Sequence, residues 1–282
     1  MKVLKQAREM AATAQALRRV GKSVGFVPTM GALHDGHCSL IRAAHRHTQV
    51  VVVSVFVNPL QFGPSEDFAS YPRDLKHDLN LSKAAGADLV FAPDASQMYP
   101  STFATQIEVG GLSERFEGAA RPGHFRGVAT VVTKLLLLVQ PTVAYVGQKD
   151  YQQALIIQRL VSDLNIPVAI RMMPTVRETD GLAMSSRNVY LSDEARRQAP
   201  VLYQALMSAK RESRRGAREV EPLVDQMRAL IAQQPLARID YVAIADAKTL
   251  ESLVTVHRRA VILAAAWIGA TRLIDNLLVD VS

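Results

Sequence analysis

Short apolar runs rich in β-branched residues alternate with longer segments of helical periodicity through the first two thirds of the chain, and this alternation constrains the fold most strongly. The run at residues 49–57 is almost continuously apolar, which is typical of a strand covered on both faces. Strands are expected at residues 23–27, 49–57, 88–91, 143–146 and 168–170, and helices near residues 38–47, 73–85, 125–139 and 150–163. Such alternation predicts an α/β fold, built on a parallel sheet with helices on both faces.

The pattern changes after about residue 175. Residues 192–233 have the pattern of two polar-faced helices, and strand candidates follow at residues 239–244 and 259–265 without a helix of useful length between them. This arrangement is typical of an α+β domain rather than of a continued parallel sheet. We therefore expect two domains, one at residues 1–175 and a smaller C-terminal α+β domain at residues 176–282.

The charge balance favours anionic ligands but does not by itself indicate nucleic acid. Among the 282 residues, 33 Lys and Arg oppose 26 Asp and Glu, which leaves a net charge of +7. The richest basic stretch, residues 210–219, contains interleaved glutamates, so a solvated helix face is the main interpretation and an RNA-binding patch is the alternative. The single cysteine, Cys38, excludes an intrachain disulfide.

The apolar segments are too short for a membrane protein. No window reaches the roughly 18 consecutive apolar residues that a spanning helix needs. The chain begins with an amphipathic stretch instead of the apolar segment of a secretory signal. We therefore expect a cytoplasmic protein.

Two common nucleotide signatures are incomplete or absent. Residues 21–23, Gly-Lys-Ser, resemble the end of a phosphate-binding P-loop, but Ala16 stands where that loop requires glycine. In addition, a strand follows where a helix should begin. No Gly-x-Gly-x-x-Gly motif occurs, which disfavours a nicotinamide or flavin enzyme.

The most informative motif joins an expected strand to an expected helix at residues 28–37. Gly31 and Gly36 allow the backbone to approach a ligand closely, and the start of a helix offers unpaired N–H groups to an anion. His34 and His37 are three positions apart and could donate hydrogen bonds to phosphate oxygens from one side of the turn. A structural pair of histidines in a tight turn is the alternative. A zinc site is a third option, but a convincing third ligand is missing nearby.

Residues 34–37, His-Asp-Gly-His, resemble the His-x-Gly-His signature of the class I nucleotidyltransferase and synthetase superfamily. The surrounding residues 27–34 narrow the resemblance to the pantoate–β-alanine ligase family. Further segments match that family in order, at residues 56–63, 71–73, 121–128, 147–153, 185–188 and 272–276. The likeness extends over essentially the whole chain. It implies a Rossmann-like fold for the parallel-sheet domain, a C-terminal domain that acts as a lid, and a homodimer.

The resemblance implies an ATP-dependent enzyme that joins an acid to an amine in two steps. The carboxylate of pantoate attacks the α-phosphorus of ATP, which forms pantoyl adenylate and pyrophosphate, and magnesium assists this step. The amine of β-alanine then attacks the adenylate and releases pantothenate and AMP. The partners would be these three small molecules, with no nucleic acid and no membrane. The alternatives are an adenylyl transferase that stops once AMP is attached to a phosphorylated acceptor, and a tRNA-charging relative.

Site residues follow from the resemblance, position by position. Gln61 and Gln153 match the family's pantoate-binding glutamines. Neutral amides suit this role, since they orient a carboxylate at less cost to its nucleophilicity than a clamping arginine would. The expected catalytic groups are His34, His37, Lys149 and Arg187. ATP is expected to contact Met30, Gly31, Ala32, Leu33, His34, Asp35, Gly36, His37, Gly147, Gln148, Lys149, Asp150, Val176, Met184, Ser185, Ser186 and Arg187.

Three weaker assignments complete the expected site. Glu117 and Arg121 match family positions near its mouth, and Asp78 matches a position where some members supply a magnesium contact. His77 stands beside Asp78 where other members are more acidic, so we expect magnesium to be held mainly by ATP phosphates and water. An Asp-Gly turn precedes the last ATP segment and would allow that loop to close.

Overall fold

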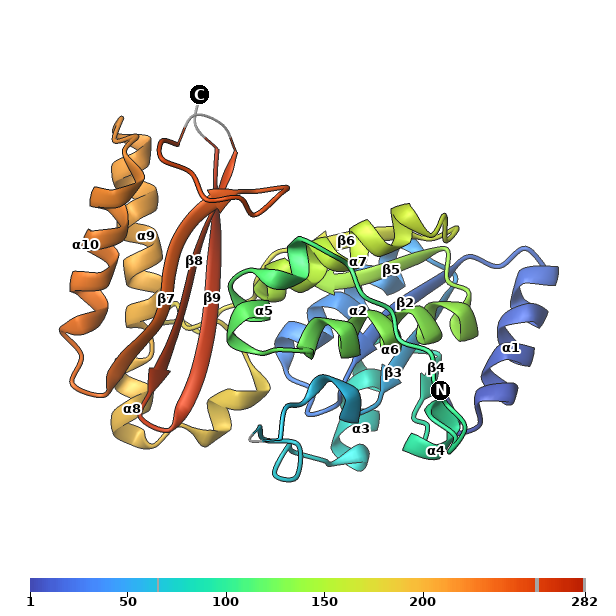
Figure 1. Ribbon diagram of the computed structural model, residues 1–282. Coiled ribbons are helices and arrows are strands. Elements are labelled where there is room, and N and C mark those ends of the chain that lie inside the picture. Colours follow the sequence, from blue (N-terminus) through green and yellow to red (C-terminus); the bar gives the residue numbers. More distant parts are fainter. Residues whose placement is uncertain (65, 257–258, 281–282) are drawn as a thin grey trace. The chain divides into compact units, whose positions relative to one another are not determined.

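The chain forms two compact units, which the computed structural model describes over residues 1–64, 66–256 and 259–280 (Figure 1). The N-terminal unit comprises Met1–Gly147 and Gln152–Pro174. The C-terminal unit comprises Gln148–Tyr151 and the described residues from Thr175 onward. Four residues from the middle of the chain therefore belong, by their contacts, to the C-terminal unit.

A six-stranded parallel sheet forms the centre of the N-terminal unit. Its strands are β1 (Lys2–Leu4), β2 (Val24–Thr29), β3 (Val50–Val55), β4 (Leu89–Phe91), β5 (Val143–Gly147) and β6 (Ala169–Met173). They lie in the order β1-β4-β3-β2-β5-β6, and all neighbours pair in parallel. The predicted parallel sheet is confirmed. β1 was not predicted, because three residues at a sheet edge carry too little pattern to be recognised.

Helices cover both faces of this sheet. They are α1 (Ala7–Arg19), α2 (Asp35–His47), α3 (Leu75–Ala85), α4 (Ala95–Met98), α5 (Glu117–Ala120), α6 (His124–Val139) and α7 (Tyr151–Asp163), with short 3-10 turns η1 (Pro59–Gln61) and η2 (Leu112–Glu114). Side chains of α2 and α3 form one core with Val27 and Val53 of the sheet. The neighbouring side chains of Phe26 and Val52 point to the opposite face and are also fully buried. The coverage expected from the apolar runs is therefore confirmed.

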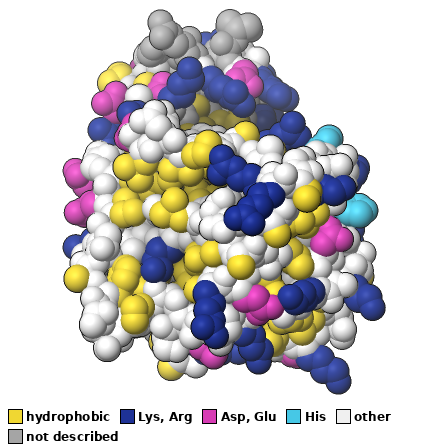
Figure 2. Space-filling view, turned by 90° about the vertical axis from the view of Figure 1, so that its right-hand side faces the viewer, with side chains coloured by type: hydrophobic (Ala, Val, Ile, Leu, Met, Phe, Trp, Pro, Cys, Tyr) yellow, Lys and Arg dark blue, Asp and Glu magenta, His cyan; other side chains and the backbone are white. Residues whose placement is uncertain are grey.

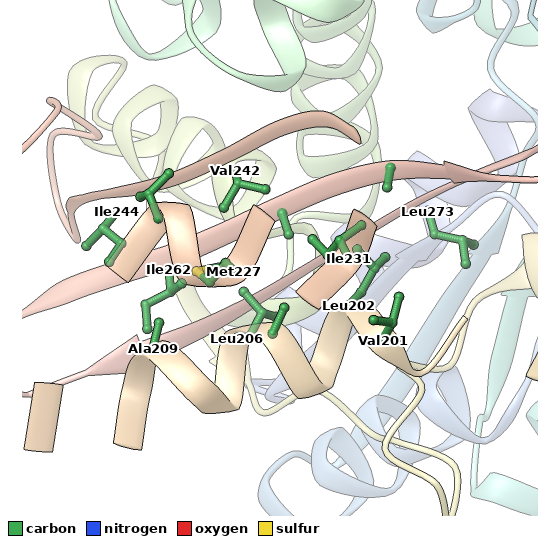
Figure 3. Close-up of a cluster of buried hydrophobic side chains, with 14 of the residues drawn as sticks. Val201, Leu202, Leu206, Ala209, Met227, Ile231, Val242, Ile244, Ile262 and Leu273 are labelled. Carbon is green, nitrogen blue, oxygen red and sulfur yellow. The ribbon is translucent and has the colours of Figure 1, made fainter. Parts of the chain in front are cut away.

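A three-stranded antiparallel sheet and three helices form most of the C-terminal unit. They are α8 (Asp193–Gln198), α9 (Val201–Arg214), α10 (Val220–Ala232), β7 (Ala237–Asp246), β8 (Ala260–Ile268) and β9 (Thr271–Val279), with 3-10 turns η3 (Gln148–Asp150) and η4 (Ser186–Tyr190). Figure 3 shows Leu206 of α9, Met227 of α10 and Ile262 of β8 in one apolar core. The predicted α+β fold is confirmed, with one helix and one strand more than expected.

The face drawn in Figure 2 is not uniformly basic. There, Lys and Arg side chains are spread among acidic, hydrophobic and uncharged ones. None of the helices in the described part of the chain has the length and apolar character that a membrane crossing requires. The basic stretch at residues 210–219 lies at the end of α9, where it also contributes an ion pair between Arg215 and Glu212.

A glycine permits α6 to lie very close to η1. A Cβ atom on Gly127 would stand 2.2 Å from the carbonyl oxygen of Leu60 and 2.6 Å from the amide nitrogen of Gln61. Both distances are far below van der Waals contact, and both atoms belong to the backbone, which cannot rotate away. Gly127 therefore sets how closely η1, and with it Gln61, can pack on α6.

We expect Gly127→Ala to lower the free energy of unfolding by about 1–3 kcal/mol, as overpacking of a tight core does. Helix propensity alone predicts the opposite sign, because alanine in a helix interior is better than glycine by roughly 0.5–1 kcal/mol. Urea denaturation measures the difference. Gly110→Ala is the control, since its Cβ would meet no atom closer than 4.0 Å. A G127A protein as stable as the wild type would show that α6 can shift without cost.

Candidate active site

The turn after β2 and the end of β5 lie at one edge of the parallel sheet. β2 pairs with β3 on one side and with β5 on the other, so the strand order reverses between β2 and β5. In open α/β sheets, ligands bind outside the carboxyl ends of the strands at such a switch point. β2 ends at Thr29 and β5 at Gly147, directly before two of the motifs identified in the sequence.

The two histidines of the turn cap α2. This helix begins at Asp35, three residues earlier than predicted, because His34 is its N-cap. The Nδ1 atom of His34 accepts a hydrogen bond from the amide of Gly36 (3.1 Å), and Nδ1 of His37 accepts one from the amide of His34 (3.4 Å). The two ring centroids are 4.1 Å apart, and both residues are half-buried. The imidazoles therefore lie side by side at the start of α2.

These hydrogen bonds fix the tautomer of each ring in its neutral form. A neutral imidazole whose Nδ1 accepts must carry its proton on Nε2, so each ring is held as an Nε2–H donor. The first turn of α2 adds backbone amides and the positive end of the helix dipole, both of which favour an anion. One nitrogen of each ring therefore serves the fold, as the structural interpretation of the histidine pair expects, while the contact with phosphate stays a prediction.

Asp78, on α3, holds the backbone that leads into the histidines. Its carboxylate accepts hydrogen bonds from the amides of Ala32 (3.1 Å) and Leu33 (2.8 Å), and the residue is only 1% exposed. Gly31 has a φ of +87°, and a Cβ there would stand 2.7 Å from Oδ2 of Asp78. Burial raises the pKa of the Asp78 carboxyl, while the two amide hydrogen bonds oppose that rise. Asp78 and the glycine together determine the shape of the turn.

Gln61 is buried at the end of η1, and a neighbouring amide orients it. Nδ2 of Asn58 donates to Oε1 of Gln61 (3.0 Å), while Oδ1 of Asn58 accepts from the hydroxyl of Tyr99 (2.7 Å). Nε2 of Gln61 then donates to the sulfur of Met30 (3.1 Å). A thioether is a weak acceptor, so an oxygen of a ligand can replace it at small cost. Gln61 therefore presents a directed N–H group next to a residue of the turn.

A neutral histidine holds the backbone carbonyl of Gln61, and an ion pair contacts that histidine in turn. Arg121 binds the carboxylate of Glu66 through two of its nitrogens, and its Nη1 lies 3.1 Å from Nε2 of His124. Nδ1 of His124 lies 2.8 Å from the carbonyl oxygen of Gln61. Since a carbonyl can only accept, His124 donates from Nδ1 and accepts from Arg121 at Nε2, which is the neutral ring. This arrangement connects the Glu66–Arg121 ion pair to the backbone of η1.

The pKa values in this network agree with that assignment. Burial, and then the positive charge of Arg121, lower the pKa of His124 from 6.5 to about 4. Burial raises the pKa of Glu66, but the hydrogen bond and the charge of Arg121 outweigh it, so the carboxyl titrates below its usual range. At neutral pH the network therefore contains one carboxylate, one guanidinium and an uncharged imidazole.

Gln152 and Gln153 begin α7 and differ in their surroundings. The side chain of Gln152 accepts from the amide of Glu117 (3.1 Å) and donates to the carbonyls of Leu112 and Arg115 (both 2.7 Å). All the polar atoms of that amide are therefore used to hold the loop that carries Glu117. Gln153 is half-buried. Gln152 is thus a structural glutamine, and Gln153 is the ligand candidate of the pair.

In the C-terminal unit, a short antiparallel turn pairs Val176 with Met184, whose amide donates to the Val176 carbonyl (3.0 Å). The sequence predicted a flexible Asp-Gly turn within this segment. The turn is present, and it is anchored, because Oδ2 of Asp180 accepts a hydrogen bond from Arg196 (2.6 Å). This turn therefore joins Val176, which is expected to contact adenine, to Met184, which begins the segment expected to contact the phosphates.

The Met184–Arg187 segment leads into η4. The hydroxyl of Ser185 caps this turn by accepting from the amide of Arg187 (3.3 Å). The amide group of Asn188 donates to the carbonyl of Ala183 (3.2 Å), which holds the segment at its other end. The hydroxyls of Ser185 and Ser186 and the guanidinium of Arg187 thus follow one another on a backbone that these hydrogen bonds hold.

Lys149 lies on η3, which the contacts assign to the C-terminal unit. Its Nζ pairs with Asp150 at 3.1 Å. The backbone carbonyls of Gln148 and Lys149 accept hydrogen bonds from the side chain of Asn276 on β9, at 2.9 and 2.8 Å. The lysine segment is therefore tied to the antiparallel sheet.

The expected site residues divide between the units. The N-terminal unit contains the turn at residues 30–37, Gln61, Asp78, Glu117, Arg121, Gly147 and Gln153. The C-terminal unit contains Gln148, Lys149, Asp150, Val176, Met184, Ser185, Ser186 and Arg187. In the part of the chain that the structure describes, no three His, Cys, Asp or Glu side chains are grouped so that they could hold a metal ion.

Four buried polar residues beside these motifs were not identified from the sequence. They are Asn58, His124, Gln152 and Asn276. Each one bonds to the backbone or the amide of a motif residue, and each lies inside a segment that carries the family resemblance. The sequence showed these four only as polar residues within motifs. The contacts in the folded chain are needed to distinguish a supporting role from ligand binding.

Comparison with known proteins places the chain in a family. A family model described as pantoate-beta-alanine ligase matches residues 2–278. A protein named pantothenate synthetase from Moorella thermoacetica is 54% identical over 267 residues, which is 95% of this chain and 94% of the relative. A crystal structure of pantothenate synthetase from Thermus thermophilus has a TM-score of 0.93 at 50% identity and covers 98% of this chain and 99% of that one.

A more distant relative was solved with ligands bound. It is a pantoate-beta-alanine ligase from Francisella tularensis complexed with beta-gamma ATP and beta-alanine. It is 34% identical, with a TM-score of 0.82, and covers 99% of this chain and 97% of that one.

The parallel sheet, its switch point and the histidine-capped turn define an α/β protein with a candidate ligand site at the carboxyl ends of its strands. Within that class, the chain belongs to the pantoate–β-alanine ligase family. Its reaction is the ATP-dependent condensation of pantoate with β-alanine to pantothenate, through a pantoyl adenylate, with release of pyrophosphate and AMP.

The neutral His124 gives a pH prediction. Its pKa is lower in the folded protein than in the unfolded chain, so between about pH 4 and 6.5 the unfolded chain binds one more proton. The stabilisation that depends on a neutral His124 should therefore be complete above pH 6.5. As the pH falls through that window, this group should lower the free energy of unfolding by up to about 1.4 kcal/mol per pH unit. His124→Asn keeps an N–H donor for the Gln61 carbonyl but does not titrate. Urea midpoints at several pH values should show a shallower slope for H124N, and equal slopes would exclude this linkage.

Proposed function

We propose that adenylation takes place at the start of α2, where the Nε2–H groups of His34 and His37 donate to the phosphates of ATP. One observation carries this proposal: both Nδ1 atoms accept hydrogen bonds inside the turn, so both rings are held as Nε2 donors. Donors fixed in advance stabilise the charge that develops on a transferring phosphate, because nothing has to reorganise when that charge appears. The backbone of residues 30–37 contributes the other contacts to the nucleotide.

We assign the remaining ATP contacts to the C-terminal unit and to Gly147. Lys149 and Arg187 supply positive charge to the triphosphate, with the hydroxyls of Ser185 and Ser186, and the backbone of Val176 contacts adenine. Cations act most strongly where negative charge builds up, which in this reaction is on the phosphates as pyrophosphate leaves. The supported backbones of η3 and η4 favour the assignment, since fixed groups are better catalysts than mobile ones.

Gln61 and Gln153 bind pantoate in this proposal. Pantoate offers two hydroxyls and a carboxylate, and amides can donate to and accept from all of them. The weak Met30 sulfur partner of Gln61 favours this role, because a pantoate oxygen replaces it with gain. Glu117 and Arg121 match family positions near the mouth of the site, and in this proposal they support it: Arg121 is paired with Glu66, and Gln152 holds the loop of Glu117. ATP and β-alanine as substrates are supported by the relative that was crystallised with beta-gamma ATP and beta-alanine.

Magnesium enters this scheme as part of Mg–ATP. Both oxygens of Asp78 already accept backbone amides, and the described residues contain no three-residue metal cluster. Among the described residues, Asp78 is the one carboxylate that we assign to the ion, and its oxygens are shared with the amides of Ala32 and Leu33. This agrees with the way Mg²⁺ is usually held, by substrate phosphates and water with one or two carboxylates.

We also propose that the enzyme works as a cytoplasmic homodimer without nucleic acid. In this proposal residues 1–175 form the nucleotide-binding domain and residues 176–282 a C-terminal lid. The acidic and hydrophobic side chains among the basic ones in Figure 2 and the glutamates among residues 210–219 favour a solvated surface over an RNA-binding one. A tRNA filter-binding titration tests the alternative, because true binding would weaken steeply with salt.

The two-step order predicts an exchange reaction. With pantoate, Mg²⁺ and ATP but no β-alanine, the enzyme should exchange labelled pyrophosphate into ATP, and the exchange should vanish without pantoate because the α-phosphorus then has no nucleophile in line. His37→Ala should reduce the exchange by about 10² or more, as expected for a lost charge-stabilising donor. An exchange that requires β-alanine would contradict the two-step order, and a folded H37A enzyme with normal exchange would remove His37 from the mechanism.

The products distinguish the neighbouring reaction classes. Complete turnover should yield AMP and pyrophosphate together with pantothenate. An adenylyl transferase that stops after the first transfer would release pyrophosphate without AMP. ADP and phosphate would indicate an acyl phosphate intermediate and hence a different class of ligase.

Two half-buried glutamines of α7, Gln153 and Gln158, give a matched prediction. Gln153→Ala should impair the use of pantoate more than that of ATP, since a site built to pair substrate hydroxyls discriminates through those contacts. Gln158→Ala is the control, because it changes the same residue type, also half-buried, further along the same helix. Steady-state kinetics with each substrate varied in turn measures the effect. An unchanged pantoate dependence in Q153A would refute the assignment.

A further inference from the structure

Asn276 occupies an unusual place for a buried polar side chain. It lies on β9 and is 2% exposed. Successive side chains of a strand point to opposite faces, so Asn276 projects to the face opposite Leu273 and Val279, which belong to the core formed with α9 and α10. On this other face it meets η3, the short turn that carries Lys149.

The amide of Asn276 is used completely by that turn. Its Nδ2 donates to the carbonyls of Gln148 (2.9 Å) and Lys149 (2.8 Å), and its Oδ1 accepts from Nε2 of Gln148 (3.3 Å). Two carbonyls can only accept, so the orientation of the amide is fixed. Asn276 thus holds two consecutive peptide groups, one on each side of the Cα atom from which the Lys149 side chain departs.

The preceding residue, Asp275, faces the other way and holds a second ATP-matching segment. Its carboxylate binds Arg177 through two hydrogen bonds, at 2.6 and 2.9 Å. Arg177 also donates to the carbonyl of Gly181 (3.0 Å), and its guanidinium lies 4.1 Å from the centroid of the Tyr203 ring. The segment from Val176 toward Met184 is therefore held by the same two-residue stretch of β9 that holds η3.

We propose that Asn276 is a positioning residue for adenylation: its side-chain amide fixes the η3 backbone so that the Lys149 ammonium is aimed at the triphosphate, in register with the Val176–Arg187 segment held through Asp275. This inference rests on the proposed role of Lys149. Lysine has a long and flexible side chain with four rotatable bonds, so the direction in which it leaves the backbone decides much of where its charge is placed. A backbone fixed by two hydrogen bonds lowers the cost of aiming that charge in the transition state.

A purely structural Asn276 would behave differently from a positioning one. Loss of a buried hydrogen-bonding group lowers stability wherever it occurs. It lowers the rate of adenylation through Lys149 only if the lysine is the group that Asn276 serves. The two roles are therefore separated by whether the effect of Asn276 depends on the presence of the Lys149 ammonium.

The test is a double-mutant cycle on pantoate-dependent pyrophosphate exchange, with Asn276→Leu and Lys149→Met. We expect N276L to lower the exchange kcat by at least about tenfold, with a smaller change in the KM for ATP, and K149M to lower it by about 10² or more. In the K149M background, N276L should cost less than about threefold, because the ammonium it positions is gone. Gln198→Leu is the control: it removes another side-chain amide bonded to backbone in the C-terminal unit, at Leu236.

The outcomes are distinct. A normal exchange rate in K149M would remove Lys149 from the mechanism and so contradict the proposed function itself. If K149M has a large effect, two results would overturn the role of Asn276 alone. One is a normal exchange rate in N276L, and the other is a double variant in which the two effects multiply fully. Thermal unfolding of every variant accompanies the kinetics. If N276L does not fold, Asn276→Asp takes its place in the cycle, since it keeps the volume and sets a carboxylate oxygen against the two carbonyls.

Discussion

A parallel sheet brings the carboxyl ends of its strands to one edge, and in this chain the strand order reverses at β2 and β5. Connections from β2 and β5 therefore leave the sheet from neighbouring strands toward different sides, which opens a place for a ligand between them. The turn with His34 and His37 follows β2, and the chain passes to η3 directly after β5. Strand order thus determines where the candidate site lies, and the motif residues there supply the proposed contacts with phosphate.

Buried polar groups fix the motifs to this frame. Asp78 holds the turn through two backbone amides, Asn58 orients Gln61, and Gln152 holds the loop of Glu117. Each of these side chains would carry a penalty if it were buried without partners, and each has its partners in the segment that it holds. Specific geometry at the site is therefore obtained by the same contacts that make burial of the polar groups tolerable.

The sequence was sufficient for the parts of the fold that repeat a pattern. The apolar run at residues 49–57 and its neighbours predicted the covered parallel sheet, because covering both faces removes the polar alternation. β9 was missed because Asp275 and Asn276 interrupt its apolar pattern, and the reason they do so is the contact with Arg177 and η3. The Arg177 contact joins residues 98 positions apart and the η3 contacts join residues 127 and 128 positions apart, which no local pattern records.

The same limit applies to the site. Spacing and residue type predicted His34 and His37 as donors, since a strand-to-helix turn defines where they stand. The tautomers that make them donors, however, depend on Nδ1 contacts within the folded turn. His124 carried no signal of its neutrality, because its pKa is set by burial and by Arg121, which only the packed structure brings together.

The distribution of charge separates the two requirements of the first chemical step. Around Gln61, Arg121 is bound to Glu66 and His124 is neutral, so the groups that orient pantoate in the proposed site are amides. A cation bound to the attacking carboxylate would stabilise the ground state and would have to be given up as the bond to phosphorus forms. In the proposed assignment, Lys149 and Arg187 act instead on the phosphates, where negative charge accumulates. Under this assignment, positive charge is neutralised near the attacking carboxylate and supplied near the departing pyrophosphate, and both effects would lower the barrier to the displacement.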